Sequence, residues 1–187
     1  MKKYILITTC LALCSCTCRQ INLTYSEKEW LNPYKKGNVL IFKSNKGNLD
    51  TITVKNKEEF ITNEDCQWFT IGDKQKQGIN IDLTANICRN DSYCEGEISI
   101  IKSDIDNETP PFFRIFGLEF SNNIDQLIKR KIVLSTTGKV YNSAYLFQDG
   151  INAENYGNNY MKLYYWDKKD GLIRYEGNDG EIFEIYK

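Results

Sequence analysis

Nine consecutive residues in the middle of the chain alternate strictly between apolar and polar side chains, and this run constrains the fold more than any other feature. They are Ile79-Asn80-Ile81-Asp82-Leu83-Thr84-Ala85-Asn86-Ile87. Successive side chains of a β-strand point to opposite faces of the sheet, so a period of two predicts a strand with one dry face and one wet face. An α-helix would scatter these apolar residues around its circumference. We therefore expect an antiparallel sheet whose other face meets solvent.

Shorter segments with the same character follow one another along most of the chain. Turn residues separate them, and the Asp170-Gly171 and Asp179-Gly180 pairs are strong signals for two-residue hairpins. About ten strands without alternating helices predict an all-β, antiparallel protein in which a curved sheet forms a half-barrel, a barrel or a sandwich. Besides 79–87, the predicted strands are 39–42, 49–54, 66–71, 97–102, 112–120, 132–134, 139–147, 160–166, 172–175 and 182–186.

One short segment has the spacing of a helix. Asn122 or Asn123 is a suitable N-cap, and the apolar residues that follow recur at intervals of three and four. Lys129 and Arg130 suit a helix C-terminus, where positive charge is favourable. We expect one short helix near 123–130.

The first residues have the layout of an export signal. Lys2 and Lys3 form a positive start, and ten mainly apolar residues follow from Tyr4 to Leu13. A membrane-spanning helix needs about 20 apolar residues, so this segment predicts a secretory signal rather than a permanent transmembrane anchor.

The signal ends in Leu13-Cys14-Ser15-Cys16, which resembles the lipobox of bacterial lipoproteins. The resemblance implies that residues 1–15 are a signal peptide and that Cys16 becomes the mature N-terminus. Cys16 would then carry a diacylglycerol thioether and an amide-linked acyl chain such as palmitate, enough to hold a protein stably on a membrane. Thr17 is not the acidic residue that retains such proteins at the inner membrane. The resemblance thus favours the outer membrane, with the domain facing the periplasm, and leaves surface display possible.

The polar residues 16–29 are predicted to be a lipidated tether and residues 30–187 a single β-rich domain. With Cys16 acylated, four cysteines remain, and they allow three full pairings. Cys88 and Cys94 bracket a polar loop, which predicts a disulfide between them, and the rival is Cys66 bonded to one of the two. Because the spacings contain no C-x-x-C motif, we expect no metal site.

The composition excludes several classes of function. The chain has no histidine, which excludes Ser-His and Cys-His nucleophile pairs, and its net charge of −1 gives no footprint for nucleic acid. No motif indicates a cofactor or a catalytic residue. Two of the strand acids could form the carboxylate pair of a glycan hydrolase, although half-exposed strands carry acids routinely. These acids are Asp82, Glu95, Glu97 and Glu119.

Two further segments are candidates for binding. Asp104 to Glu108 is rich in acids but lacks the glycine of an EF-hand loop, so we expect a solvated turn. The tail from Tyr164 to Glu181 resembles the closing hairpins of small Gram-negative envelope lipoproteins and the sheet of lipoprotein carriers, which implies a curved surface able to hold an acyl chain. The leading hypothesis is a non-catalytic envelope lipoprotein that binds a protein, a glycan or a lipid. The alternatives are the carboxylate hydrolase and a structural or inhibitory module.

Overall fold

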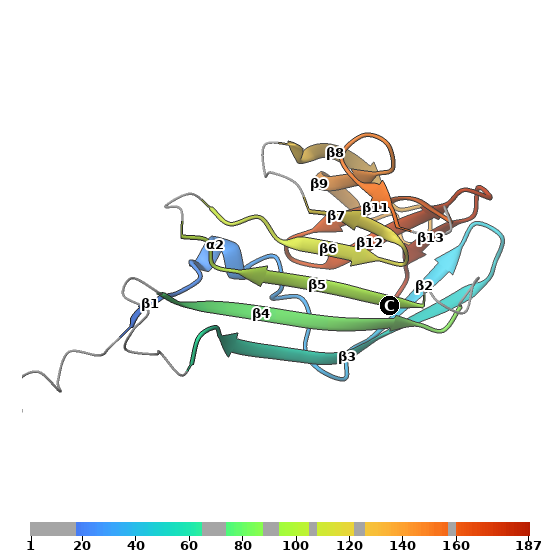
Figure 1. Ribbon diagram of the computed structural model, residues 1–187. Helices are drawn as coiled ribbons and strands as arrows, with labels where there is room; N and C mark the ends of the chain where they lie inside the picture. The colour runs from blue at the N-terminus through green and yellow to red at the C-terminus, as the bar shows by residue number, and fades with distance from the viewer. Residues whose placement is uncertain (1–17, 65–73, 88–93, 105–107, 122–125, 157–159) are drawn as a thin grey trace, which may run out of the picture.

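The protein is a strongly curled antiparallel sheet that forms a half-barrel, as the sequence predicts, and its described residues include one short helix (Figure 1). The computed structural model describes residues 18–64, 74–87, 94–104, 108–121, 126–156 and 160–187. Hydrogen-bonded neighbours run in the order β10-β7-β6-β5-β4-β3-β2-β13-β12-β11-β9-β8, and β1 pairs with β4 beside this path. The elements are β1 (Arg19–Ile21), α2 (Tyr25–Lys28), β2 (Val39–Ser44), β3 (Leu49–Ile61), β4 (Lys74–Ala85), β5 (Glu95–Ile101), β6 (Phe112–Ile115), β7 (Leu118–Phe120), β8 (Ile128–Val133), β9 (Val140–Gln148), β10 (Glu154–Asn155), β11 (Met161–Asp167), β12 (Gly171–Gly177) and β13 (Ile182–Ile185).

The alternating run forms most of β4, a central strand of the sheet. Ile79, Ile81 and Leu83 are buried, whereas the polar residues between them are only partly covered. β4 pairs with β3 on one side and β5 on the other. The prediction that one face of this strand is buried and the other is partly exposed to solvent is therefore confirmed.

The predicted strand 112–120 is two strands joined by a tight turn. Ile115 and Leu118 are cross-strand partners, so only Phe116 and Gly117 lie between β6 and β7, and both have positive φ angles, 46° and 92°. Two positive φ values characterise the I′ turn that matches the twist of a hairpin. Because type I′ turns usually carry Asn-Gly, the turn at Phe116-Gly117 was not recognised from the sequence. In β6, Phe113 is buried while Phe112 is half-exposed.

The helix predicted near 123–130 is wrong at its C-terminal end. Ile128, Lys129 and Arg130 begin strand β8, which pairs with β9, and residues 122–125 lie outside the described part. The segment with helical spacing was too short for this spacing to outweigh pairing with the neighbouring strand. The described helix is α2, a single turn that Thr24 and Glu27 cap reciprocally.

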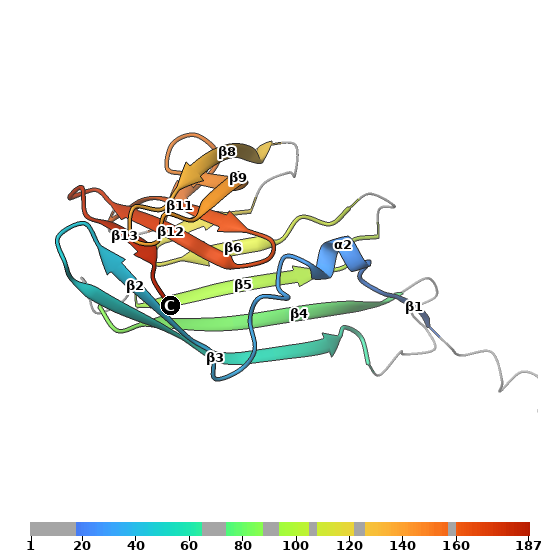
Figure 2. The same cartoon turned by 180° about the vertical axis from the view of Figure 1, so that it is seen from behind.

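The folded domain begins at Arg19 rather than at Trp30. β1 pairs in parallel with the start of β4, with Arg19 opposite Lys74. Leu23 and Glu27 are buried. Figure 2 shows the chain that follows α2 crossing in front of β4 and β5 on its way to β2. We call residues 19–34 the N-terminal plug, because they fill the half-barrel where the sequence suggested a polar tether.

Aromatic side chains fill the inside of the half-barrel. Phe147 stacks on Tyr164 with ring centroids 4.7 Å apart. Trp30 of the plug contacts Phe113 at 5.9 Å, and Phe113 contacts Trp166 at 4.8 Å. In the described residues, the concave side of the sheet is therefore packed with protein side chains. This packing counts against the interior groove for an acyl chain that the resemblance to lipoprotein carriers implies.

Candidate functional site

Two adjacent hollows on the outer surface form the best-built candidate site among the described residues. They share Pro33 and Lys169, and we call them together the Pro33 groove. The first hollow has a volume of about 400 Å³ and is lined by Tyr25, Glu29, Asn32, Pro33, Lys168 and Lys169. The second has a volume of about 370 Å³ and is lined by Pro33, Leu40, Leu134, Thr137, Lys139, Tyr141, Lys169, Asp170, Ile185, Tyr186 and Lys187.

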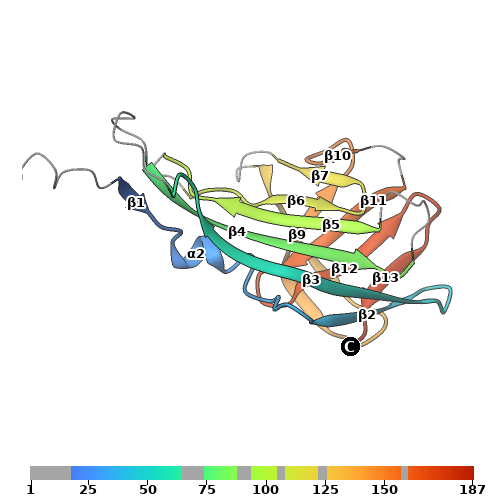
Figure 3. The same cartoon turned by 60° about the horizontal axis from the view of Figure 1, so that its bottom comes forward.

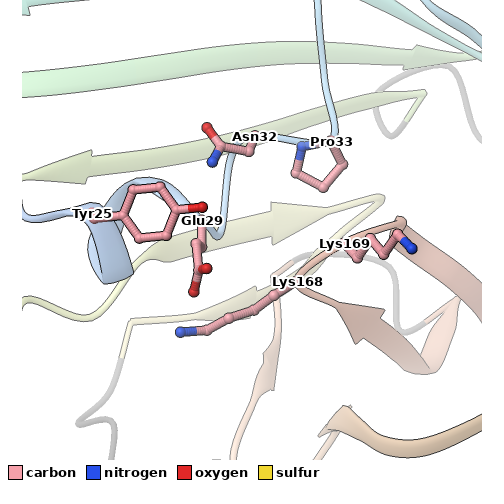
Figure 4. Close-up of a pocket in the computed structure, with 6 residues that line it drawn as sticks. All are labelled: Tyr25, Glu29, Asn32, Pro33, Lys168 and Lys169. Atoms are coloured by element: carbon pink, nitrogen blue, oxygen red, sulfur yellow. The ribbon is translucent and has the colours of Figure 1, made fainter.

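The first hollow lies between the plug and the β11–β12 turn (Figure 4). Tyr25 stands at the start of α2, and its side chain is 78% exposed. Across the hollow, Lys168 extends toward α2, where its Nζ donates to the carbonyl of Ser26 at 3.4 Å and lies 4.6 Å from the ring centre of Trp30. Lys169 extends the opposite way, toward the second hollow. The wall of this hollow is thus mixed: an open aromatic ring, an amide, a carboxylate and two ammonium groups.

Asp170 organises the polar side of the second hollow. Its Oδ2 accepts hydrogen bonds from Lys139 Nζ at 2.5 Å and from the Tyr141 hydroxyl at 2.8 Å. Burial acts to raise the pKa of the Asp170 carboxyl, but these hydrogen bonds outweigh it, and the pKa lies below its usual value. Burial also raises the pKa of Tyr141 to about 12. The lining of the second hollow therefore combines the neutral phenol of Tyr141 and the Lys139–Asp170 ion pair with the apolar residues Leu134 and Ile185.

A buried carboxylate fixes the plug that carries the first hollow. Glu27 is fully buried and accepts hydrogen bonds from Lys102 Nζ at 2.8 Å and the backbone N–H of Thr109 at 2.7 Å. Burial would raise its pKa, but these bonds and those from Thr24 lower the pKa to about 2. Lys57 donates to the carbonyls of Leu31 and Tyr34 and so holds the other end of the plug. The walls of the groove are therefore positioned before any ligand arrives.

The acids considered for hydrolysis do not line this groove. Asp82, Glu97 and Glu119 lie in a cross-strand row with Arg114. Arg114 pairs with Glu97 at 3.7 Å and with Glu119 at 3.1 Å. Glu95 is exposed at the start of β5. Two of the four candidates are thus occupied by one guanidinium on the solvent-facing side of the sheet.

The acidic segment at 104–108 is only partly described, because 105–107 lie outside the described residues. Asp104 pairs with Lys74 at 3.4 Å and Lys76 at 2.6 Å, and Glu108 pairs with Lys168 at 3.7 Å. Both acids therefore bind lysines of the same chain.

The cysteine predictions fall mostly outside the described residues, which exclude Cys16, Cys66 and Cys88. Cys94 lies at the far end of β4, where its carbonyl accepts from the N–H of Ala85, whereas Cys18 directly precedes β1 at the near end. These two ends are about 36 Å apart at 3.3 Å per residue, which excludes pairing of Cys18 with Cys94. The Cys88–Cys94 disulfide stays a prediction.

The aromatic residues of the tail belong mainly to the core. Tyr164 and Trp166 are fully buried on one face of β11, and Tyr165 between them is half-exposed on the other face beside Arg174. Successive residues of β11 therefore point to opposite faces of the sheet. Sequence reasoning did not single out Tyr25, Pro33 or Asp170 as site residues, because only the docking of the plug onto the β11–β12 turn brings them together. The capping box of Thr24 and Glu27 was a local sequence signal for α2, the helix that carries Tyr25.

The chain matches no family model, no curated protein and no solved structure. Within the part of the chain that the structure describes, no helix has both the length and the apolar character needed to cross a membrane.

Proposed function

We propose that this chain is a non-catalytic lipoprotein, anchored at the outer membrane by acyl chains on Cys16, that binds an envelope glycan in the Pro33 groove. The N-terminal lysines, the ten-residue apolar segment and the cysteine motif support the anchor. The groove supports the binding role, since its hollows have the volume of small-molecule sites and its walls are fixed by buried contacts.

The mixture of aromatic and polar side chains in the groove is the observation that supports a glycan as the ligand. Tyr25 stands at one end with 78% exposure and Tyr186 at the other with 50%. An exposed phenol ring offers a flat apolar face for a sugar ring, while amide, carboxylate and ammonium groups bond hydroxyls. Asn32, Glu29 and Lys169 supply these groups. A lipid chain would need a continuous apolar channel, and the packed interior argues against one.

Several observations favour binding over hydrolysis. The chain lacks histidine. The two carboxylates of the groove lie in different hollows, and Asp170 is already bonded to Lys139 and Tyr141. A hydrolase needs an acid and a second carboxylate that flank one glycosidic bond. The groove offers recognition groups without such a pair.

The test compares two exposed tyrosines on an array of peptidoglycan fragments and lipopolysaccharide oligosaccharides. Tyr25→Ala removes the ring of the first hollow. Tyr156→Ala removes a 56% exposed ring that lies over Arg114, outside the groove. Loss of one stacking contact should weaken binding about tenfold, equivalent to about 1.4 kcal/mol, and Tyr156→Ala should leave it unchanged.

Equal weakening by both variants would contradict the glycan site. Absence of binding to every arrayed glycan would favour a protein partner on the same surface. The anchor is tested separately: radiolabelled fatty acid should enter the native chain and not Cys16→Ser, and label in the variant would contradict the anchor.

A further inference from the structure

We propose that the domain stands on the membrane by the end of the sheet that carries β1 and presents the second hollow of the Pro33 groove away from the lipid. This inference rests on the proposed anchor at Cys16 and goes beyond it, because it specifies which surface meets the bilayer. It follows from chain length and strand register.

The connection between anchor and domain is short enough to keep the β1 end of the sheet close to the bilayer. Arg19 is fixed by parallel pairing with Lys74 at the start of β4. Only three peptide links separate Cys16 from Arg19, and they reach at most about 11 Å between Cα atoms, whatever path they take. Arg19 must therefore lie within about 11 Å of the lipidated residue, and Lys74, one strand spacing away, within about 16 Å.

The second hollow lies at the opposite end of the same strands. Leu40, which lines it, pairs with Ile52, and Ile52 pairs with Ala85 at the end of β4. Eleven register positions separate Lys74 from Ala85, which corresponds to about 36 Å along a strand. Figure 3 shows β1 at one end of the long strands and the β2–β3 turn at the other. The tether thus holds the β1 end near the bilayer, and the length of the strands allows the second hollow to stand up to about 36 Å away from that end.

Charge contributes little to this orientation. At the β1 end, Lys74 and Lys76 both pair with Asp104, and Lys28 pairs with Glu59. Unpaired basic residues near an anionic membrane each contribute about 1 kcal/mol. Lys74 and Lys76 share the single carboxylate of Asp104, and Arg19 is exposed, so a small positive surplus remains at this end. The surplus favours the same orientation as the tether, so neutral and anionic membranes should orient the domain alike.

The experiment uses the lipidated protein in vesicles with nitroxide-labelled headgroups. A genetically encoded fluorescent residue replaces Glu64, whose carbonyl accepts from Gln75 near β1, or Lys46 in the β2–β3 turn. Both positions are exposed, and β3 holds them about 40 Å apart. Position 64 should lose most of its emission, whereas position 46 should stay near its value in unlabelled vesicles. Neutral and anionic vesicles should give the same contrast.

A flexible insert of about 20 Gly and Ser residues before Arg19 provides the matched control, because its root-mean-square span of roughly 25 Å frees the domain to tumble. The contrast between positions 64 and 46 should collapse in this variant. Equal quenching at both positions with the native tether would overturn the orientation. Failure of the protein to float with vesicles, or a mature N-terminus without lipid mass, would instead overturn the anchor itself.

Discussion

The N-terminal plug and the closing hairpins of residues 161–185 pack into the same half-barrel but are held there differently. The hairpins are bound by ladders of backbone hydrogen bonds between β9, β11, β12 and β13, with two register shifts between β11 and β12. Among the described residues, the strand ladders of the plug are limited to the three-residue pairing of β1 with β4. Lys102, directly after β5, and Lys57 of β3 secure the rest of it through their side chains. The groove lies where these two regions meet, so it depends on both kinds of attachment.

A cavity in the hairpin region should have the largest effect. Trp166 is fully buried against Phe113 and Tyr34, and Trp166→Ala should lower the free energy of unfolding by about 4 kcal/mol. Because the hairpins belong to the sheet, the loss should appear as one cooperative transition in urea. Trp166→Phe keeps most of the volume and should cost clearly less. A second transition at lower urea concentration, confined to the hairpins, would contradict the view that they unfold together with the rest of the sheet.

A methyl group at Gly171 should strain the contact between the two regions. Gly171 has φ of +77°, and an added Cβ would lie 2.5 Å from the Tyr34 hydroxyl, which accepts from the N–H of Leu172. Gly171→Ala should cost about 3 kcal/mol, since left-handed backbone strain adds to overpacking. Gly138 has a similar φ of +71° but nothing within 4 Å. Gly138→Ala should cost only about 1 kcal/mol, and equal losses in urea unfolding would exclude the steric contribution of Tyr34.

Removal of the buried carboxylate should loosen the plug before the hairpins. Glu27→Ala leaves Lys102 and the N–H of Thr109 without their acceptor and should cost about 3 kcal/mol. Hydrogen exchange should quicken in residues 24–34 and much less in β11 and β12. The exposed Glu58→Ala serves as the control and should change stability by less than about 0.5 kcal/mol. Equal loosening of plug and hairpins would contradict their different attachment.

Acid should release the plug through the same group. The pKa of Glu27 is about 2 in the folded chain, below its ordinary value of 4.5, so its stabilisation is present above pH 4.5 and is lost as the pH falls toward 2. By pH 3 the loss relative to pH 7 should be about 2 kcal/mol. Glu27→Gln should remove this part of the pH dependence in urea titrations. Parallel curves for the native chain and the variant would show that Glu27 does not carry it.

The two regions also differ in how far the sequence predicts them. Period two in 79–87 and the Asp-Gly turns located β4 and the closing hairpins, because backbone pairing follows from local alternation. The turn at Phe116 was not predicted, because it lacks the Asn that usually marks a turn with positive φ. The strand that begins at Ile128 was not predicted, because its apolar residues also fit the spacing of a helix. The groove was not predictable, because its lining residues come from segments more than a hundred positions apart.

By itself the sequence determined that this chain forms antiparallel strands with one buried face, since alternation is a local property that any register must satisfy. The sequence also supplies the cysteine motif on which the anchor proposal rests. Only the tertiary structure decided that residues 19–34 enter the half-barrel and that Glu27 finds Lys102 there. The physical reason is that such contacts join residues distant along the chain and exist only after the sheet has curled around them.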